Sequence, residues 1–406
     1  MILRYIYDNG VRRFVKMQDI TSYLYSFEEL RNGNFLYVDK TEYIRKLLRP
    51  SAAGYFLARP RRFGKSLTIS TLKAIFEGKK HLFEGLAISK TDYDWKTYPV
   101  IHLSFADLTA SANTAMGVKK YLLEKVRGIA EKFSIPVTSE EPGTCLGQLI
   151  DKLNDDSKVV VLVDEYDKPL VDNIQSPHVK EIRDELKCFY GVLKDRNAAL
   201  RLLFVTGVTK FCHVSLFSGV NNLTDITMHA DYAAMLGYTQ SEFEFAFSEY
   251  IAQACSKTGL SREELLPQIK DWYDGYRFHA KAEAVYNPVS LAKFFENNAE
   301  FSNYWFATGT PSFLLKLAKE KNLDIEKTIN EPCLGFAFNA FEIENIDPVV
   351  LLLQTGYLTI KKSWGEYGET LYYLDFPNRE VKGSFETYLI NAYTDCTGKY
   401  HRHYCL

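Results

Sequence analysis

The sequence predicts an α/β protein with a mainly parallel β-sheet flanked by helices, followed by a part made mainly of helices. Short apolar runs alternate with helical stretches between residues 51 and 235, which is typical of parallel strands buried on both faces. After about residue 236 the strand-like runs give way to helical ones. The 406 residues are enough for two or three domains at roughly 100–200 residues each.

The sheet domain is expected at residues 51–235, with residues 1–50 packing on it as an N-terminal segment. Residues 17–50 predict short helices with one extended piece, Phe35–Val38. The predicted strands are Tyr55–Ala58, Val100–Phe105, Val159–Val163 and Leu200–Thr206, with Asp225–Met228 as a weaker fifth. The predicted helices are Lys65–Phe76, Ala115–Phe133, Leu146–Leu153 and Pro177–Lys194.

Residues 236–390 are expected to form a helical and winged-helix-like domain. Two of its helices begin with the spacing of a capping box, in which side chains satisfy N–H groups of the first turn. The pairs are Thr239 with Glu242 and Ser261 with Glu264. From residue 346 a helix-like run precedes two extended pieces, an order that resembles the end of a winged helix. No linker rich in Pro, Gly or Ser separates the two halves, so we expect them to pack together.

The composition excludes several classes of protein. With 46% hydrophobic and 25% charged residues, the chain as a whole is globular rather than disordered. A net charge of −2 excludes a uniformly basic nucleic-acid binder, and no apolar run reaches the 18 residues of a membrane span. The seven cysteines lack a C-x-x-C spacing and the N-terminus lacks a signal-peptide pattern, which predicts reduced thiols and a cytoplasmic location.

The first predicted strand runs directly into a phosphate-binding motif, and a helix follows. The motif is Arg59-Pro60-Arg61-Arg62-Phe63-Gly64-Lys65-Ser66. In such a P-loop, backbone N–H groups and the positive end of a helix dipole converge on phosphate oxygens, so all eight residues are expected to bind a nucleotide. Lys65 is expected to reach the β- and γ-phosphates and the Ser66 hydroxyl to bind Mg²⁺. The first glycine of G-x-x-x-x-G-K-[ST] is Arg59 here, which predicts a differently shaped turn.

An acidic pair follows a second strand. Val159–Val163 leads straight into Asp164 and Glu165, about a hundred residues after the P-loop. Asp164 is expected to hold Mg²⁺ through water, and Glu165 to orient and deprotonate the attacking water. The two motifs together predict hydrolysis of a nucleoside triphosphate.

Three residues near these motifs need a separate interpretation. Thr206 ends the next strand, and it either acts catalytically on the γ-phosphate or the attacking water, or it caps the strand. Asp167 and Lys168 are expected to form a local ion pair on a solvated turn rather than to act in catalysis.

The arginines of the loop also leave two interpretations open. They either contact phosphate or pair with nearby acids such as Asp39 or Asp167, and at least one is expected on phosphate. Arg277 is a weaker candidate for an arginine that reaches the site from the second domain.

Four further patterns give little support for an additional binding or catalytic site. Aromatic residues between positions 27 and 43 favour core packing over a base pocket. Lys361–Lys362 is the one obvious basic pair in the winged-helix-like part, which is weak support for nucleic-acid contact. Asp375, Glu380 and Lys382 fit a nuclease trio only superficially. In the tail, Cys396, His401, His403 and Cys405 do not have the usual spacing of zinc ligands.

A set of short segments extends the two motifs over about residues 20–390. They are Phe27–Arg31, Tyr37–Thr41, Phe56–Ser66, Asp164–Pro169, Thr206–Phe211, Leu216–Leu223, Tyr286–Pro288, Thr308–Pro311 and Phe376–Asn378. This set resembles a bacterial family of AAA-ATPase-like P-loop proteins, in which Arg59 matches the family's own loop. The resemblance implies an ATPase core with a helical and winged-helix-like extension, and ATP rather than GTP as the nucleotide.

Members of this family usually continue into a nuclease-like domain of the PD-(D/E)XK type. Here that domain is expected to be absent or truncated, with residues 391–406 as a disordered tail or its truncated start. The resemblance therefore does not predict nuclease activity for this chain.

The leading functional hypothesis is a Mg²⁺-dependent, ATP-hydrolysing switch in which the nucleotide repositions residues 236–390 against the sheet domain. A nucleotide-binding interaction module that does not hydrolyse, and a nucleic-acid-associated ATPase, are the alternatives. Besides ATP, a second copy or a protein partner stays open, whereas the charge does not support nucleic acid and no membrane contact is expected.

Overall fold

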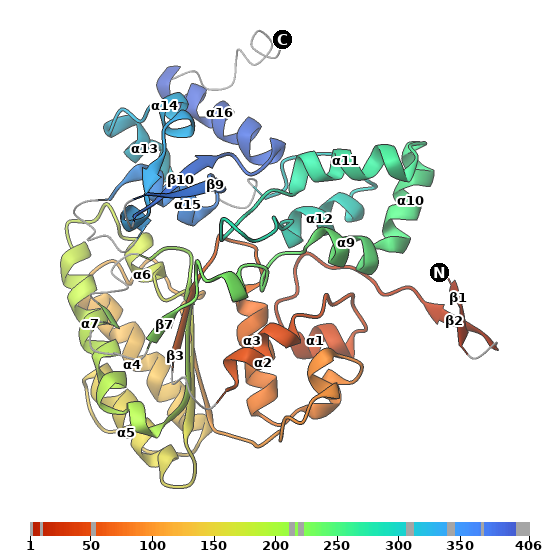
Figure 1. Cartoon of the computed structure of the whole chain (residues 1–406). Helices are drawn as coiled ribbons and strands as arrows, with labels where there is room; N and C mark the ends of the chain where they lie inside the picture. The colour runs from red at the N-terminus through yellow and green to blue at the C-terminus, as the bar shows by residue number, and fades with distance from the viewer. Residues whose placement is uncertain are drawn as a thin grey trace.

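The computed structural model describes residues 3–8, 11–49, 54–210, 216–217, 223–305, 312–338, 346–366 and 369–394. A central β-sheet with helices on both faces forms the lower half of the molecule in Figure 1, and helices with a small sheet lie above one edge of it. The predicted fold class is confirmed.

Five parallel strands form the central sheet in the order β4-β5-β6-β3-β7. They are β3 (Gly54–Ala58), β4 (Val100–Ser104), β5 (Val159–Asp164), β6 (Leu200–Gly207) and β7 (Leu223–Asp225). Every residue of β3 and β5 is buried, as expected for continuous apolar strands covered on both faces. The fifth strand ends at Asp225, the residue at which the sequence pattern predicts that it begins.

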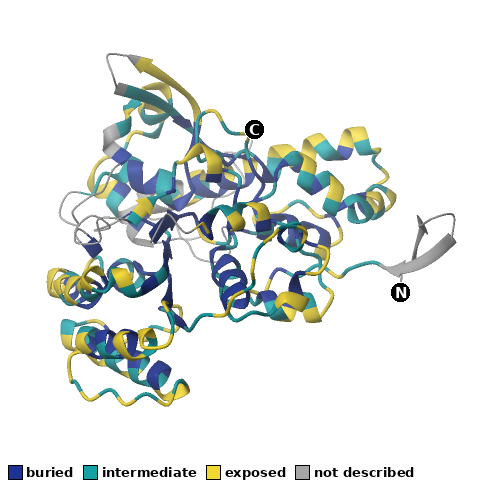
Figure 2. Ribbon diagram, turned by 60° about the horizontal axis from the view of Figure 1, so that its bottom comes forward, coloured by how far each residue is buried: buried dark blue, intermediate teal, exposed yellow. Residues whose placement is uncertain are grey.

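Alternate residues of the strands enter separate cores on the two faces of the sheet. Leu57 and Leu162 join α3 (Lys65–Phe76) in one core. Phe56 and Val161 join the helices of the opposite face in the other core. Those helices are α4 (Ala115–Lys132), α5 (Pro142–Asn154) and α7 (Val179–Asp195). Figure 2 shows the buried residues between the exposed outer faces of the helices.

Short elements complete the first half. Before the sheet lie β1 (Leu3–Asp8), β2 (Val11–Lys16), α1 (Phe27–Asn32) and α2 (Thr41–Leu47). Between the strands lie η1 (Lys80–Phe83), η2 (Ala87–Lys90), α6 (Lys168–Val171) and η3 (Asn197–Ala199), and η4 (Ala230–Tyr232) follows β7. Helices α1 and α2 confirm the short helices expected there. The β1–β2 hairpin projects from the body (Figure 1), although the whole segment 1–50 was expected to pack on the sheet domain.

The C-terminal part begins with a helical cluster. It contains α9 (Gln240–Ala246), α10 (Ser248–Thr258), α11 (Arg262–Tyr273) and α12 (Pro288–Glu296). Both predicted capping boxes are present, at the start of α9 and of α11. An aromatic-rich core that includes Phe243, Phe247 and Phe294 holds these helices together.

The remaining elements form a three-stranded antiparallel sheet, in the order β8-β10-β9, and the helices around it. They are α13 (Ser312–Glu320), α14 (Ile325–Asn330), β8 (Cys333–Leu334), η6 (Gly335–Phe338), α15 (Pro348–Thr355), β9 (Thr359–Glu366), β10 (Glu369–Asp375) and α16 (Arg379–Thr394). Helix α15 precedes the β9–β10 ribbon, as the sequence suggested. The winged-helix interpretation itself stays a prediction.

The two halves share one hydrophobic core. Leu57 and Leu72 of the sheet domain belong to the same buried cluster as Tyr276, Leu351 and Tyr357 of the C-terminal part. This continuity agrees with the absence of a linker in the sequence. It also places the C-terminal part directly against the P-loop.

Candidate functional site

Parallel pairing brings the P-loop and the acidic pair to the same edge of the sheet. Strand β6 lies between β3 and β5, and Ala58 pairs with Gly207 at one end of that register. After the strands end, the Arg59 N–H donates to the Gly207 carbonyl oxygen at 3.1 Å, and the Tyr166 N–H donates to the Thr206 carbonyl oxygen at 3.1 Å. Both motifs therefore leave the sheet beside the end of β6.

The P-loop turns sharply before α3 begins. Arg62 and Gly64 both have left-handed backbones, with φ of 67° and 90°. A left-handed Arg62 is strained, whereas Gly64 adopts this conformation easily. A Cβ atom added to Gly64 would meet nothing within 4 Å, so this side of the loop is open.

Lys65 lies at the centre of the site. Its side chain is buried, and Nζ donates to the carbonyl oxygens of Arg59 at 3.0 Å and Pro60 at 2.8 Å. Burial lowers the pKa of Lys65 to about 8, while the charges of Asp164, Glu165 and Asp167 act in the opposite direction. The ammonium group and these three carboxylates thus belong to one electrostatic site.

The two acids of the pair have different surroundings. Asp164 is buried, and within the part of the chain that the structure describes its Oδ1 has no hydrogen-bond partner. Glu165 is half-buried and has a left-handed backbone with φ of 54°. Burial, together with the charge of Asp164, raises the pKa of Glu165. A buried carboxylate oxygen without a donor fits a bound cation or its water.

A cavity of about 350 Å³ opens between these groups. Its wall includes the P-loop, both carboxylates Glu165 and Asp167, and two residues after β6, Val208 and Thr209. Asp164 contributes nothing to the wall. From the C-terminal part, Thr355 at the end of α15 completes it.

The P-loop residues divide into two groups. Arg61, Arg62, Gly64, Lys65 and Ser66 line the cavity. Two other members face away from it: Pro60 is buried against Gly356, and Phe63 packs its ring on Tyr276 at 4.8 Å and on Phe278 at 5.4 Å. The side chains of Pro60 and Phe63 therefore hold the loop, and only their backbones remain candidates for phosphate contact.

The Arg59 side chain is not the loop arginine that reaches the cavity, and its backbone stays a predicted phosphate contact. Its buried guanidinium donates to the carbonyl oxygens of Ala58 at 2.9 Å, Thr227 at 2.6 Å and Tyr232 at 3.2 Å. It also lies over the Phe278 ring at 4.1 Å, and burial lowers its pKa to about 9. Carbonyl acceptors beyond β7 direct this side chain away from the cavity. The expectation that at least one loop arginine reaches the site then rests on Arg61 and Arg62.

For Thr206, the structure favours the structural interpretation over the catalytic one. It is fully buried, and its hydroxyl donates to the Leu57 carbonyl oxygen at 2.8 Å across the sheet. The proposed catalytic role of Thr206 is therefore wrong in this geometry, because the hydroxyl is engaged between two strands. Thr209, three residues later, reaches the cavity instead.

The interpretation of Asp167 and Lys168 as an ion pair is also wrong. Asp167 is buried and accepts hydrogen bonds from the Val208 N–H at 3.1 Å, the Thr209 N–H at 2.7 Å and the Thr209 hydroxyl at 2.7 Å. Lys168 pairs with Asp172 at 2.9 Å. Asp167 therefore ties the acidic turn to the loop after β6. The sequence shows an acidic residue at this position of the segment Asp164–Pro169. It does not show that the Asp167 carboxylate would point to the loop after β6.

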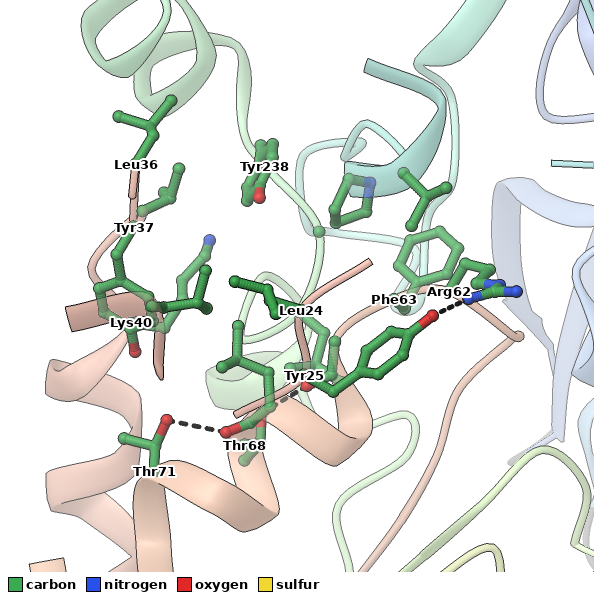
Figure 3. A pocket seen from close by; sticks show the side chains of 18 of the residues that line it. Leu24, Tyr25, Leu36, Tyr37, Lys40, Arg62, Phe63, Thr68, Thr71 and Tyr238 are labelled. Carbon is green, nitrogen blue, oxygen red and sulfur yellow. Dashed lines mark hydrogen bonds between the residues drawn. The ribbon is translucent and has the colours of Figure 1, made fainter. Parts of the chain in front are cut away.

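A second, mostly apolar cavity of about 110 Å³ adjoins the first. Tyr37 and Lys40 line it on one side, Thr68 on α3 on another, and Tyr238 on a third (Figure 3). Tyr25, Arg62 and Gly64 line both cavities. The sequence favoured core packing for the aromatic residues 27–43, and this holds for Phe27, which packs on Phe83 at 4.6 Å.

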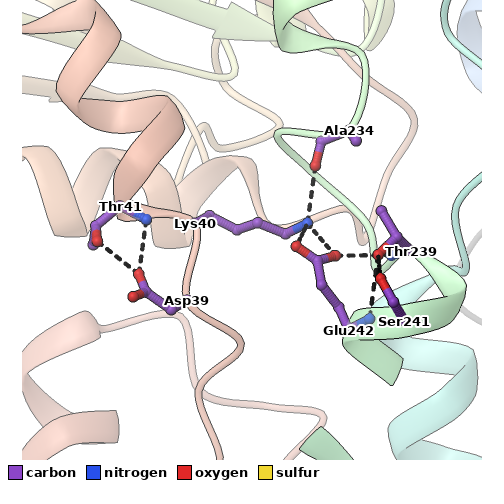
Figure 4. A network of polar contacts seen from close by, with 7 residues as sticks. All are labelled: Asp39, Lys40, Thr41, Ala234, Thr239, Ser241 and Glu242. Atoms are coloured by element: carbon purple, nitrogen blue, oxygen red, sulfur yellow. Dashed lines mark hydrogen bonds and ion pairs between the residues drawn. The ribbon is translucent and has the colours of Figure 1, made fainter. Parts of the chain in front are cut away.

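An ion pair between buried Lys40 and half-buried Glu242 supports the wall of this second cavity (Figure 4). The Lys40 ammonium contacts the Glu242 carboxylate at 2.6 Å and donates to the Ala234 carbonyl oxygen at 2.9 Å. Burial lowers the pKa of Lys40 although Glu242 opposes this shift. Asp39, named above as a partner for the loop arginines, instead accepts bonds from the backbone N–H groups of Thr41 and Ala87. The Lys40–Glu242 pair joins the N-terminal segment to α9.

The remaining candidates lie outside the site. The Arg277 guanidinium donates to the Lys361 carbonyl oxygen at 2.9 Å and does not line the cavity. Glu380 is fully buried and accepts from the Ser290 hydroxyl and the Trp305 N–H, so it does not face Asp375 as a nuclease carboxylate would. The tail residues Cys396, His401, His403 and Cys405 lie outside the described residues.

Two kinds of feature, a metal-binding cluster and a membrane-spanning helix, are absent among the residues that the structure describes. No group of three or more His, Cys, Asp or Glu side chains is arranged to hold a metal ion by itself. Among the same residues, no helix combines the length and the apolar character that crossing a membrane requires.

A P-loop and an acidic pair at one edge of a parallel sheet define the core of a P-loop NTPase-like protein. Residues 23–217 match the model of a family described as "Predicted AAA-ATPase". An "Uncharacterized protein in vnfD 5'region" of Azotobacter chroococcum mcd 1 is 38% identical over 373 residues, which span 91% of this chain and 69% of that relative. The chain belongs to this family of predicted AAA-ATPases.

Proposed function

We propose that the protein binds ATP together with Mg²⁺, hydrolyses it, and uses the bound nucleotide to reposition residues 236–390 on the sheet domain. One observation carries the proposal. Lys65 is buried at a cavity lined by the P-loop, where the charges of Asp164, Glu165 and Asp167 act on its ammonium group. Family membership supports nucleotide binding, and the choice of ATP follows from the family resemblance.

The larger cavity is the proposed place of the phosphates. Lys65 would exchange its two carbonyl acceptors for phosphate oxygens, which are stronger acceptors for an ammonium group. The open face of Gly64 and the first turn of α3 would present backbone N–H groups to the same anion. Arg61 and Arg62 add positive charge to the wall.

Ser66 would bind Mg²⁺ with its hydroxyl, because it lines the cavity. Asp164, behind the wall, would hold the ion through water with its buried oxygen that lacks a donor. Bound there, Mg²⁺ would supply charge neutralisation at the phosphates. Glu165 would accept the proton of the attacking water. Its raised pKa makes it a better base than an ordinary surface carboxylate, and its position in the wall gives it access to that water.

The smaller cavity is the proposed place of the base. Its apolar lining and the rings of Tyr37 and Tyr238 suit a flat heterocycle. Because Gly64 and Arg62 border both cavities, one molecule can extend from one to the other.

Contacts between the P-loop and the C-terminal part support the proposed switch. The Trp305 indole donates to the Arg61 carbonyl oxygen, and a Cβ on Gly356 would lie 2.7 Å from Pro60. The Lys210 N–H donates to the Gln354 side chain at 2.9 Å, so the loop after β6 is joined to α15 as well. A change in loop conformation on nucleotide binding would therefore act directly on residues 236–390, the second domain that we propose.

The decisive experiment compares two variants in ATP binding and in phosphate release. Glu165→Gln should bind ATP with near-wild-type affinity and lose at least a hundredfold in turnover, because only the base is removed. Lys65→Ala should lose both. Glu124→Gln, on the exposed face of α4, is the matched control and should behave as wild type. Wild-type turnover in Glu165→Gln would refute the assigned base.

One observation favours a second candidate, a nucleotide-binding module that does not hydrolyse by itself. Among the described residues of the C-terminal part, Thr355 lines the phosphate cavity but no arginine does, and Arg277 is engaged elsewhere. A second copy or a protein partner would then have to supply an arginine. Phosphate release measured over a range of protein concentrations separates the two candidates, since turnover per chain should rise steeply with concentration only in the second case. The cysteine pattern of the sequence supports the cytoplasm as the location in either case.

A further inference from the structure

We propose that residues 17–26 form a strap that gates entry to the nucleotide site. The proposal deepens the proposed function and rests on it, because it concerns the regulation of the same two cavities. The strap has no helix or strand of its own, and it runs from the helical cluster of the C-terminal part to α1 on the sheet domain (Figure 1).

One end of the strap is attached to the C-terminal part. The Tyr250 hydroxyl on α10 donates to the Gln18 carbonyl oxygen at 2.7 Å and accepts from the Ile20 N–H at 3.1 Å. The Glu296 carboxylate at the end of α12 accepts from the Ser22 N–H at 3.0 Å and from the Ser22 hydroxyl at 2.8 Å. These contacts join segments more than 200 residues apart in the sequence.

The other end is attached to the sheet domain. The Phe27 N–H donates to the Ser70 hydroxyl of α3 at 2.9 Å. Between the two ends, the Tyr25 hydroxyl contacts the Arg62 guanidinium, and Figure 3 shows this contact bridging the strap and the P-loop. The strap is therefore fixed to both halves of the molecule and to the phosphate-binding loop itself.

The middle of the strap covers the proposed nucleotide path. Thr21, Ser22 and Leu24 line the smaller cavity, and Tyr25 lines both cavities. A nucleotide with its base in the smaller cavity and its phosphates in the larger one would pass between Gly64 and the Tyr25–Arg62 contact. Entry or exit of such a ligand requires the strap to move.

The contacts that hold the strap can open without unfolding the molecule. They are side-chain hydrogen bonds and one backbone bond, from the Leu36 N–H to the Asp19 carbonyl oxygen at 2.9 Å, rather than a ladder of backbone bonds. Each opening therefore breaks only local structure. A phenol is also a weaker partner for a guanidinium than a phosphate is, so an incoming anion can compete for Arg62.

The test measures access to the smaller cavity without relying on ATP. A cysteine placed in its wall as Leu67→Cys is labelled with a small thiol reagent, and the rate at position 67 is followed by peptide mass spectrometry, which separates it from the native cysteines. Glu296→Ala removes both anchors of Ser22 from an exposed position, and Glu300→Ala on the following loop is the matched control. We expect at least fivefold faster labelling with Glu296→Ala and an unchanged rate with Glu300→Ala.

The converse experiment holds the strap in place with a cross-link. Ser22→Cys combined with Glu296→Cys, joined by a short thiol-reactive cross-linker, should slow labelling at position 67 at least tenfold. Ser22→Cys alone or Glu296→Cys alone, treated with the same reagent, should not slow it. Equal labelling rates in the loosened, locked and wild-type proteins would overturn the proposal.

ATP association and dissociation, followed by rapid filtration of radiolabelled ATP, then separate the two proposals. For a gate, both rates should rise in Glu296→Ala while their ratio, the affinity, changes less than twofold. An affinity loss with an unchanged association rate would mean that the strap binds the ligand rather than gates it. If wild-type protein retained no ATP, the proposed function would fail, while the labelling rates would still decide whether the strap covers the cavity.

Discussion

The indole N–H of Trp305 donates a hydrogen bond of 3.1 Å to the carbonyl oxygen of Arg61. Trp305 comes from the C-terminal part, whereas Arg61 stands in the P-loop that follows the first strand of the central sheet. One backbone position of the P-loop is thus held by the C-terminal part of the chain.

Replacing Trp305 by Phe should therefore weaken ATP binding as well as folding. The ring contacts with Tyr276 and Tyr357 can be kept, but the Arg61 carbonyl oxygen loses its donor. We expect a loss of about 1 kcal/mol in the free energy of unfolding and a several-fold weaker affinity for ATP. Urea denaturation and equilibrium binding measure the two effects. Trp272→Phe, which alters a ring stacked on Phe301 in the helical cluster, should change stability without changing ATP affinity.

Asp167→Asn should damage both stability and turnover. The three hydrogen bonds from Val208 and Thr209 all end on Oδ2, and Oδ1 lies 3.3 Å from the Val208 N–H. An amide replaces the charged acceptor with a weaker, neutral one, and its NH₂ group takes the place of one acceptor oxygen beside these donors. We expect about 2 kcal/mol of destabilisation and a reduced rate of phosphate release. Asp172→Asn alters the exposed partner of Lys168 and should leave stability nearly unchanged. A wild-type urea midpoint in Asp167→Asn would contradict the assigned role.

The loop arginines should separate into a structural and a binding residue. Arg59→Ala leaves three carbonyl oxygens without their buried donor, so we expect a loss of about 3 kcal/mol or more in the free energy of unfolding. Arg61 is exposed in the cavity wall, so Arg61→Ala should change stability by less than about 0.5 kcal/mol. The affinity of the Arg61→Ala variant for ATP should fall by about tenfold or more, because a charge-assisted contact is lost. Thermal unfolding and ATP titration of both variants check this separation, and an equal loss of stability in the two would contradict it.

Glu380 should make the stability of the protein depend on pH. Burial raises the pKa of this carboxyl to about 7, against 4.5 in the unfolded chain. Between these values the folded state binds more protons than the unfolded state, so the free energy of unfolding falls as the pH rises. The contribution is fully present below about pH 4.5 and is lost above about pH 7.

The neutral variant Glu380→Gln should lack this pH dependence. Relative to it, wild-type protein should lose up to about 3 kcal/mol between pH 4.5 and pH 7.5. Urea unfolding at several pH values measures the difference. Glu386→Gln changes an exposed acid on the same helix and should run parallel to wild type. A pH-independent difference between wild type and Glu380→Gln would show that the carboxyl is not proton-linked to folding.

Much of the sheet domain was predictable because its signals are local. The helix after the P-loop runs from Lys65 to Phe76 as expected, since Gly64 supplies the left-handed residue before it. Strand β5 runs directly into the acidic pair, because five consecutive apolar residues suit a strand buried on both faces. The capping boxes at Thr239 and Ser261 also depend only on residues three positions apart.

The directions of individual side chains were not predictable in this way. Arg59 turns away from the cavity because β7 lies beside β3, which brings the carbonyl oxygens of Thr227 and Tyr232 to its guanidinium. The smaller cavity likewise depends on segments that meet only in the folded chain, such as residues 21–25 and 235–238.

The sequence by itself determined four strands of the central sheet and the main helices around it, and that a P-loop and an acidic pair follow two of the strands. Hydrophobic periodicity and local capping encode these features over a few residues. Only the tertiary structure decided which P-loop side chains line the larger cavity, which donors bind Asp167, and how the strap runs past the two cavities. Those outcomes depend on the strand order β5-β6-β3-β7 and on the docking of the C-terminal part, and both bring together groups that are far apart in the sequence.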